Sequence, residues 1–528
     1  MSSISKTEKY FYRIFFVSMI MLIAVSCVTK KIAVKESPEV ISIIPIPSEV
    51  IYDRAVNNYF RLTNNTNIYV DKDNDELRRI GQYIAGKINT PTGFDLSVFD
   101  SGNLSEDGNI YLRIVEDETL GTEGYKLTVT QKNIIIEAAK TNGIFYGVQT
   151  LRQLLPDEIE SNTIKNIEWR VRTVSIKDYP RYEWRGAMLD VARHFFPVED
   201  VKHYIDMLAL YKINRLHLHL TDDQGWRIEI KSWPNLTAHG ASTAVDGDPG
   251  GFFTQDDYKE IIDYAFERYI TVIPEIDMPG HTNAALASYP ELNCDGIAPE
   301  LFTGIKVGFS SLCVEKEITY EFINDVIGEL AQITKGPYIH IGGDEAKSTK
   351  EEDYIKFINR VEEIVKSNGK KIIGWDEIVN ADISNLSIAQ FWATKSNAVK
   401  ASQKKVQIIM SPSTRIYLDM KYNPSTPIGL FWAGYIDIKK SYDWDPSTEI
   451  DGVTDENILG VEAPLWTETV KTMNDIEYMA FPRLIGAAEI GWSKQHLRQW
   501  ENYSQRLNLH KNRLKILDIN FYQDNDIK

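Results

Sequence analysis

The stretch Thr254–Ile276, TQDDYKEIIDYAFERYITVIPEI, holds one complete helix followed by one complete strand. Thr254 and Asp257 have the spacing of a capping box, which predicts the start of a helix. Thr271–Ile276 is a short apolar run, typical of a buried strand. The helix is predicted from apolar residues that recur on one face: Tyr258, Ile261, Ile262, Ala265, Phe266 and Tyr269.

The same alternation of strand and helix continues through residues 180–515. Eight strand–helix units over about 330 residues predict a (β/α)₈ barrel, the TIM-barrel fold, as the catalytic domain of an α/β protein. A sandwich or a doubly wound sheet fits the spacing less well. The predicted strands are Ala187–Asp190, Arg215–Leu220, Thr271–Ile276, Tyr338–Ile341, Lys371–Gly374, Ile388–Phe391, Gln407–Met410 and Ile458–Glu462.

Residues 49–176 have a different pattern, in which strand-like runs surround the helical segments Glu76–Ile88 and Gly143–Leu154. This pattern predicts a small α+β domain ahead of the barrel. None of its residues suggests chemistry, so we interpret it as a support domain. Residues 28–48 are polar and contain proline, and we interpret them as a tether.

Residues 1–27 resemble an export signal. Lys6, Lys9 and Arg13 precede the apolar run Ile14–Val25, which is too short to span a bilayer, since about 20 apolar residues are needed. Cys27 follows small residues, as in the lipobox of bacterial lipoproteins. We therefore expect an exported protein, lipidated at Cys27 and held by this anchor alone to a membrane in the periplasm or at the cell surface. Plain signal cleavage and an uncleaved anchor are the alternatives.

The other two cysteines, Cys294 and Cys313, predict a disulfide, because an exported protein is exposed to an oxidising compartment. Two buried thiols are the alternative. The formal net charge of −17 excludes nucleic acid and anionic membrane surfaces as favoured partners, since both require a basic face. The charge leaves the oligomeric state open.

Carboxylates and aromatic residues recur at the predicted strand ends. In a barrel of this kind the active site lies at the C-terminal ends of the strands. An acidic pocket lined with aromatic rings suits a neutral sugar, which stacks on indole and donates hydroxyl protons to carboxylates. The residues near these ends are Arg185, Asp190, His194, Asp222, Trp226, Asp277, His281, Asp344, Glu345, Trp375, Asp376, Trp392, Tyr417, Asp419, Trp466 and Glu468.

Five motifs, in this order, resemble those of the β-N-acetylhexosaminidases of glycoside hydrolase family 20. They are WRGAMLDVARH (184–194), LHLHLTDDQGW (216–226), PEIDMPGH (274–281), HIGGDEA (340–346) and YLD (417–419). Upstream, EGY (123–125) and GIFYGVQTL (143–151) are similar to the N-terminal domain of that family. The resemblance covers most of residues 180–490. It implies an exo-acting enzyme that removes terminal non-reducing β-linked GlcNAc or GalNAc from glycans or chitooligosaccharides, without a cofactor or metal.

The resemblance also implies catalytic roles for three residues. Two glycines ahead of Asp344 and Glu345 let the backbone turn and approach a ligand closely. In the family the 2-acetamido oxygen of the substrate attacks the anomeric carbon and forms an oxazolinium ion, with overall retention. Glu345 would protonate the departing oxygen and then activate water. Asp344 would orient the acetamido N–H, and Tyr417 would donate to the acetamido carbonyl.

Further residues would bind the sugar or support the catalytic pair. Arg185, Asp222 and Glu468 would bind hydroxyl groups of the non-reducing sugar, with Asp419 also in contact. Asp277, His281 and His340 would support the catalytic carboxylates, although His340 can equally be a core histidine. The aromatic residues that would wall the acetamido pocket or stack on a sugar ring are Trp375, Trp392, Trp466 and Trp432.

Three alternatives stay open at this point. His217 and His219 share a face of their strand, so they could chelate a metal together with Asp222 or Asp344, as in a metal-dependent barrel amidohydrolase. An inert glycan-binding lipoprotein would need a missing catalytic carboxylate, and both are present. A biosidase that releases an N-acetylated disaccharide would need a pocket with one open wall.

Overall fold

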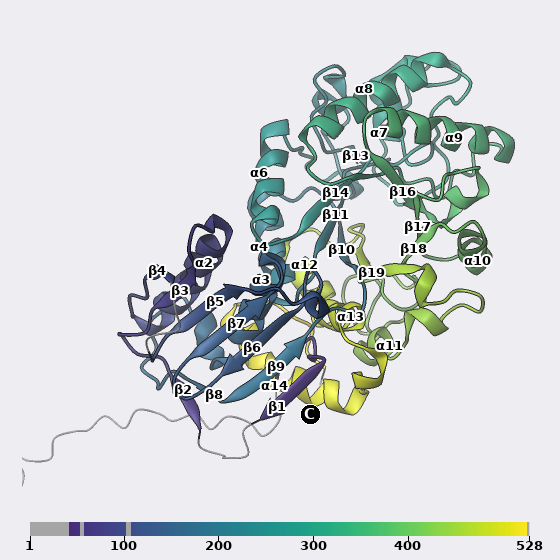
Figure 1. Ribbon diagram of the computed structural model, residues 1–528. Coiled ribbons are helices and arrows are strands. Elements are labelled where there is room, and N and C mark those ends of the chain that lie inside the picture. The colour runs from purple at the N-terminus through teal and green to yellow at the C-terminus, as the bar shows by residue number, and fades with distance from the viewer. Residues whose placement is uncertain (1–41, 53–57, 102–106, 525–526, 528) are drawn as a thin grey trace, which may run out of the picture.

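The computed structural model describes residues 42–52, 58–101, 107–524 and 527. They form a smaller N-terminal domain and a larger barrel domain, which lie side by side (Figure 1). The predicted export signal with Cys27, and most of the predicted tether, lie outside these residues. Within the described part of the chain, no helix is both long and apolar enough to cross a membrane.

All eight predicted barrel strands are present, and they close into a parallel barrel in chain order. The first strand pairs with both the second and the last, which completes the circle. The strands are β10 (Trp184–Asp190), β11 (Arg215–His219), β14 (Thr271–Glu275), β15 (Tyr338–His340), β16 (Lys371–Trp375), β17 (Ile388–Phe391), β18 (Gln407–Met410) and β19 (Ile458–Leu465).

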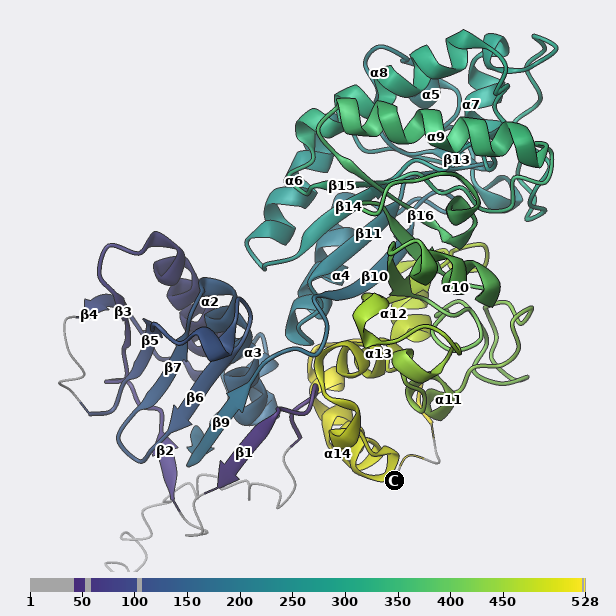
Figure 2. The same cartoon turned by 45° about the vertical axis from the view of Figure 1, so that its right-hand side comes forward.

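Helices surround these strands (Figure 2). They cover the outer face of the barrel, so that each strand is buried on both sides, as expected for a parallel sheet. The helices are α4 (Val198–Leu210), α5 (Asn235–Ala238), α6 (Gln255–Phe266), α7 (Asn283–Ser288), α8 (Glu317–Ile333), α9 (Glu351–Ser367), α10 (Lys395–Gln403), α11 (Ile438–Tyr442), α12 (Met473–Ala480), α13 (Arg483–Trp492) and α14 (Trp500–Ile516).

Helix α6 shows how local sequence produces this architecture. Thr254 and Asp257 form the predicted capping box, in which each side chain accepts a hydrogen bond from the backbone of the other. The helix ends at Phe266, earlier than its apolar pattern predicted, and Phe266 itself is 54% exposed. Tyr269 adopts a left-handed conformation with φ of 59°, which turns the chain into β14.

The N-terminal domain is a seven-stranded sheet with the order β1-β9-β6-β7-β5-β3-β4. Helices α2 (Asp75–Thr92) and α3 (Thr141–Leu154) pack on it, which agrees with the predicted α+β class. The sheet ends at residue 178, two residues after the predicted domain boundary. Its strands are β1 (Glu49–Tyr52), β3 (Ile68–Asp71), β4 (Val98–Ser101), β5 (Ile110–Ile114), β6 (Tyr125–Val129), β7 (Ile134–Ala138) and β9 (Val174–Asp178), beside the separate pair β2 (Tyr59–Arg61) and β8 (Arg170–Arg172).

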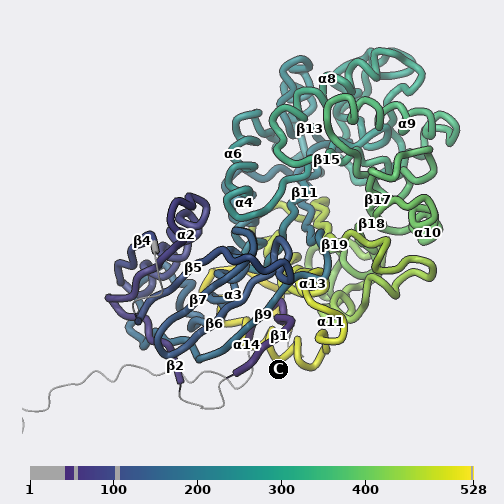
Figure 3. Tube along the Cα trace, in the orientation of Figure 1, coloured from purple at the N-terminus to yellow at the C-terminus, as the bar shows by residue number. Residues whose placement is uncertain are grey.

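The last described part of the predicted tether, residues 42–48, is built into the fold. Ile43 and Ile44 are fully buried, and the Ile44 N–H donates to Gln153 Oε1 at 2.8 Å. The Ile46 N–H donates to Glu489 Oε2 at 2.8 Å. The prediction of a tether up to residue 48 is therefore wrong for residues 42–48. Figure 3 shows this start of the described chain beside the C-terminal helix α14.

Arg185 lies at the junction of the two domains and not at the C-terminal ends of the barrel strands. It is the second residue of β10, and its side chain is fully buried. Its Nη1 and Nη2 donate to the two oxygens of Glu123 at 2.9 and 2.8 Å. The prediction that Arg185 binds sugar hydroxyls is wrong, because a residue that begins a barrel strand lies at the end opposite the active site.

The predicted disulfide is present between Cys294 and Cys313. It closes a loop of sequence separation 19, which lies between α7 and α8. On the chain-entropy account, closing a loop of this size stabilises the fold by about 3 kcal/mol.

The Arg185–Glu123 pair gives a prediction about stability. Glu123→Gln should destabilise the protein by about 3–5 kcal/mol, because it leaves the buried Arg185 charge without its partner. Urea or thermal unfolding measures the loss, with Glu118→Gln, the same change at an exposed position of this domain, as control. The variant should keep the wild-type KM. If Glu123→Gln instead raised KM and left the free energy of unfolding unchanged, Arg185 would have a role in substrate binding.

Candidate active site

A cavity of about 360 Å³ opens at the C-terminal ends of the barrel strands, where the fold predicts an active site. Most of the residues that line it were predicted from the sequence. These are His281, Asp344, Glu345, Trp392, Tyr417, Asp419, Trp432, Trp466 and Glu468. The sequence reasoning missed four others: Arg193, Ile305, Val307 and Leu430.

A tight turn after β15 brings two adjacent carboxylates into this cavity. Gly342 and Gly343 have φ of 65° and 96°. A Cβ on Gly342 would lie 1.7 Å from Asp277 Oδ1, so a larger residue does not fit. Glu345 also has a positive φ, 46°, a conformation that costs a non-glycine residue about 1–3 kcal/mol and is typical of functional sites. The strained turn places both Asp344 and Glu345 on the cavity wall.

Asp344 is buried, and its Oδ1 has no hydrogen-bond partner in the described part of the chain. Burial, together with the charges of Glu275 and Glu345, raises the pKa of Asp344 to about 6, against the opposing effect of His281. Burial and the neighbouring Asp344 raise the pKa of Asp277 well above its usual range. Asp277 Oδ1 accepts a hydrogen bond from the Gly343 N–H at 3.1 Å, and Asp277 lowers the pKa of Asp344 against the effect of burial.

His281 connects Asp344 and Glu345 to a third carboxylate. Its Nε2 lies 3.7 Å from Asp344 Oδ2 and 3.7 Å from Glu345 Oε2, and its Nδ1 lies 3.1 Å from Asp222 Oδ1. Burial lowers the pKa of His281, but the charges of Asp222 and Asp344 outweigh burial and raise it well above its usual range. The cationic ring therefore lies beside both Asp344 and Glu345, the position that its predicted supporting role requires.

Asp222 does not line the cavity and is 1% exposed, which corrects its predicted role as a sugar ligand. Its oxygens are already occupied by Arg193 Nη2 at 2.7 Å, His219 Nε2 at 2.9 Å and His281 Nδ1. Arg193 itself lines the cavity. The strand-end argument fits Arg193, because it follows β10 within the motif at 184–194, whereas Arg185 begins that strand.

Aromatic rings form another part of the lining, the aromatic wall. The rings of Trp432 and Tyr417 have centroids 5.9 Å apart, and Trp432 lies 6.1 Å from Trp392. Burial and the charge of Asp344 raise the pKa of Tyr417 well above its usual range, so its phenol stays protonated and can donate a hydrogen bond. Trp375 is 1% exposed and does not line the cavity; it packs behind Trp466, with centroids 5.7 Å apart.

Acceptor oxygens gather at another part of the wall. Both oxygens of Asp419 and Oε2 of Glu468 are buried and have no hydrogen-bond partner among the described residues. Burial and the charge of Glu468 raise the pKa of Asp419. Buried polar atoms without partners are rare, and in a cavity they mark positions where a ligand supplies the missing hydrogen bonds. Beside the Arg193 guanidinium, these carboxyl groups suit sugar hydroxyls.

Comparisons with known proteins agree with this geometry. A family model described as glycosyl hydrolase family 20, catalytic domain, matches residues 182–495. A second model, described as domain 2 of the same family, matches residues 40–179. The chain belongs to glycoside hydrolase family 20. The resemblance inferred from the five motifs is confirmed, and the N-terminal domain belongs to the family's architecture.

Several relatives of this hydrolase are hexosaminidases. A β-N-acetylhexosaminidase of Cellulomonas fimi is 40% identical over 471 residues, which cover 88% of this chain and 93% of the relative. The structure of the Streptomyces plicatus N-acetyl-β-hexosaminidase in complex with Thio-NAglucal has 48% identity and a TM-score of 0.90, covering 94% of this chain and 99% of that chain. A mutant of that enzyme was solved with the product GlcNAc; it has 48% identity and a TM-score of 0.89, with the same coverage. This family 20 hydrolase is a β-N-acetylhexosaminidase, which sets aside the amidohydrolase and the inert binding protein.

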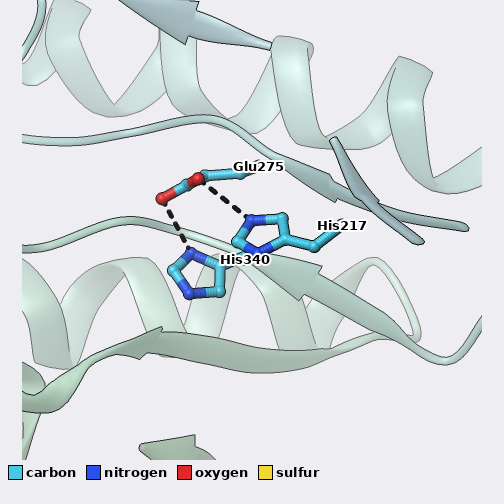
Figure 4. Close-up of side chains that lie close together, drawn as sticks. All are labelled: His217, Glu275 and His340. Carbon is cyan, nitrogen blue, oxygen red and sulfur yellow. Dashed lines mark ion pairs between the residues drawn. The ribbon is translucent and has the colours of Figure 1, made fainter. Parts of the chain in front are cut away.

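Buried inside the barrel of the hexosaminidase lies a layer of ion pairs. His217 Nε2 and His340 Nδ1 each lie 3.0 Å from an oxygen of Glu275, and His217 Nδ1 lies 2.8 Å from Glu462 Oε1 (Figure 4). His219 pairs with Glu275 and Asp222. The two histidines of the predicted metal pair are thus matched with carboxylates. Two roles were predicted for His340, support of the carboxylates or a place in the core. The structure places it in the core, where it is fully buried.

The shifted pKa of Asp344 predicts how the hexosaminidase responds to acid. Its pKa is raised to about 6, so the carboxylate is increasingly protonated as the pH falls below that value. If catalysis needs the carboxylate, kcat/KM should fall about tenfold per pH unit below about pH 6, because this parameter reports ionisations of the free enzyme. Circular dichroism at each pH controls for unfolding. Activity that stays constant down to pH 4 in folded protein would contradict the prediction.

Proposed function

We propose that this hexosaminidase removes terminal non-reducing β-linked GlcNAc or GalNAc, and that the 2-acetamido group of the substrate is the nucleophile. The position of Asp344 carries the proposal. Asp344 lines the cavity beside Glu345, and its Oδ1 has no hydrogen-bond partner among the residues that the structure describes. A carboxylate at this position can accept the acetamido N–H while its neighbour transfers the proton. The resemblance of the HIGGDEA motif to family 20 supports the same roles.

In the first step the acetamido carbonyl oxygen forms a bond to the anomeric carbon, and the bond from that carbon to the leaving oxygen breaks. Glu345 gives its proton to the leaving oxygen, which departs as an alcohol. The product is an oxazolinium ion with a positive charge spread over the new ring. Asp344, ionised and shielded from water, stabilises this charge more strongly than it would in bulk solvent.

In the second step water attacks the anomeric carbon and opens the oxazolinium ring. Glu345, now a carboxylate, accepts the proton of this water, which restores the starting enzyme. Two displacements at one carbon retain the β configuration. Tyr417 donates a hydrogen bond from its phenol O–H to the acetamido oxygen. This hydrogen bond holds the nucleophile in line for attack.

The remaining cavity residues bind the sugar. Trp392 and Trp466 enclose the acetamido group, while Trp432, 55% exposed, offers its face to a sugar ring at the cavity mouth. Asp419 and Glu468 accept hydrogen bonds from hydroxyl groups of the non-reducing sugar. Arg193 takes the place that the sequence reasoning assigned to Arg185, because it is the arginine on the cavity wall.

The acid role of Glu345 predicts a dependence on the leaving group. Glu345→Gln should lower turnover of substrates with poor leaving groups by about 10² to 10⁴, the usual range for general acid catalysis. Aryl glycosides with acidic phenols should lose less in the bond-breaking step, because those phenols leave without a proton. A leaving-group series on both proteins measures this, and an equal loss across the series would remove Glu345 from the acid role.

We also propose that the hexosaminidase is exported and anchored to a membrane through a lipid on Cys27. Support comes from the basic start, the short apolar run and the small residues ahead of this cysteine. The Cys294–Cys313 disulfide is consistent with an oxidising compartment. The enzyme would then meet its glycans outside the cytoplasm.

Cys27→Ser tests the anchor. Wild-type protein should fractionate with membranes and incorporate a radiolabelled fatty acid, whereas the variant should lose the label, because serine offers no thiol for acylation. Cys294→Ser, which removes a cysteine elsewhere, is the matched control and should keep the label. An unlabelled wild-type protein in the soluble exported fraction would favour plain signal cleavage.

A further inference from the structure

Glu275 is a fully buried carboxylate at the C-terminal end of β14 that the proposed mechanism does not use. Four side-chain nitrogens surround it. Its Oε1 accepts from Trp375 Nε1 at 2.9 Å and lies 3.0 Å from His340 Nδ1. Its Oε2 lies 3.0 Å from His217 Nε2 and is also paired with His219 Nδ1. Figure 4 shows the Glu275 carboxylate between His217 and His340.

One route leads from Glu275 to the acetamido end of the cavity. The hydrogen bond from Trp375 fixes the orientation of that indole. The Trp375 ring packs against Trp466, with centroids 5.7 Å apart and planes at 37°. Trp466 lines the cavity, and its ring lies 6.4 Å from Tyr417. A movement of Trp375 would therefore shift Trp466, which Trp375 contacts on the side away from the cavity.

A second route leads to the catalytic carboxylates. His219, held by Glu275 through Nδ1, places its Nε2 2.9 Å from Asp222 Oδ2. Asp222 in turn holds His281, which lies 3.7 Å from both Asp344 and Glu345. One carboxylate thus supports both the acetamido wall and the catalytic pair.

We propose that Glu275 is a positioning residue that determines how tightly the cavity closes around the substrate's N-acyl group. The proposal rests on the proposed function, since it takes the Trp466 wall as the acetamido site. Glu275 touches no substrate. It acts through Trp375, and it sets specificity for N-acetyl over larger N-acyl groups.

The chemistry of the carboxylate explains why glutamine cannot replace it. Both oxygens of the carboxylate accept hydrogen bonds, Oε1 from Trp375 Nε1 and Oε2 from His219 Nδ1, whereas His340 Nδ1 accepts from the Gly342 N–H. An amide has one oxygen, and its NH₂ group would face N–H donors. Burial lowers the pKa of His217, but Glu275 and Glu462 together raise it to about 9, so the ring is a cationic donor at neutral pH. Glu275→Gln therefore leaves donors unpaired and frees the Trp375 indole.

Glu462 provides a matched control in the same layer. It is also fully buried and is surrounded by His217 Nδ1 at 2.8 Å, Trp184 Nε1 at 2.9 Å and Gln390 Nε2 at 2.9 Å. None of these three partners lines the cavity. Glu462→Gln makes the same chemical change in the same layer; Glu462 shares His217 with Glu275 but accepts no hydrogen bond from Trp375.

The experiment compares aryl β-glucosaminides that carry an N-acetyl or an N-propionyl group. Glu275→Gln should lower kcat/KM for the N-acetyl substrate by about 10²-fold, the usual effect of a misplacement near 1 Å. The N-acetyl to N-propionyl ratio of kcat/KM should fall at least about threefold, because a loosened wall admits the extra methylene, which a tight wall rejects by about 10- to 200-fold. Glu462→Gln should keep the wild-type ratio, whatever its effect on thermal stability.

A double-mutant cycle tests whether Glu275 acts through Trp375. Trp375→Phe keeps an aromatic ring but removes the indole donor, so it should also lower the ratio. The losses of Glu275→Gln and Trp375→Phe should be less than additive in the double variant, since both break one hydrogen bond. If Glu275→Gln does not fold, Trp375→Phe alone gives the result.

Three outcomes would overturn the proposal: an unchanged ratio in Glu275→Gln or Trp375→Phe, an equal fall in Glu462→Gln, or additive losses. The wild-type enzyme separates this failure from that of the proposed function. Brisk hydrolysis of an aryl β-glucoside, which lacks the acetamido group, would overturn the substrate-assisted mechanism and this proposal together. If the wild-type enzyme required the N-acetyl group and the N-acetyl to N-propionyl ratio were unchanged in the variants, only the role of Glu275 would be overturned.

Discussion

Charges enclosed by the barrel must be neutralised within it, because the closed strands and their helices keep them from water. An isolated buried charge costs far more free energy than one hydrogen bond returns. Glu275 and Glu462 are both fully buried, and His217 lies between them within hydrogen-bonding distance of each. The aromatic wall, through Trp375, and His281, through His219 and Asp222, are attached to this layer. The geometry of the cavity therefore depends on an ion-pair arrangement that a ligand never contacts.

Much of this arrangement follows from local sequence. All eight barrel strands were predicted, because short apolar runs between amphipathic helices identify them, and strand ends then locate the site. The error at Arg185 has a physical cause. Strand β10 begins at Trp184, but a charged residue interrupts the apolar run that indicates a strand. Its charge is compensated by Glu123, 62 residues earlier in the chain, and periodicity carries no information about such a distant partner.

The roles of individual side chains within the site were harder to predict than their positions. Trp375 is the last residue of β16 and Trp466 directly follows β19, yet only Trp466 lines the cavity. The difference lies in Glu275, which holds the Trp375 indole in the interior. Ile305 and Val307 were missed because they lie on an irregular loop, where neither helical nor strand periodicity applies. Loop residues of this kind can be assigned to the cavity only from the folded structure, which brings them to the barrel strands.

The junction between the ends of the chain has a consequence for how the protein is made. The carbonyl of Ile43 accepts a hydrogen bond from Arg506, and Arg513 pairs with Glu160 of the N-terminal domain. Both arginines lie on α14, the last helix. Ribosomes deliver a chain from its N-terminus, so the first domain emerges long before these partners. The junction cannot be completed until the chain through residue 513 is available, so the first domain keeps an uncovered edge until the last helix packs against it.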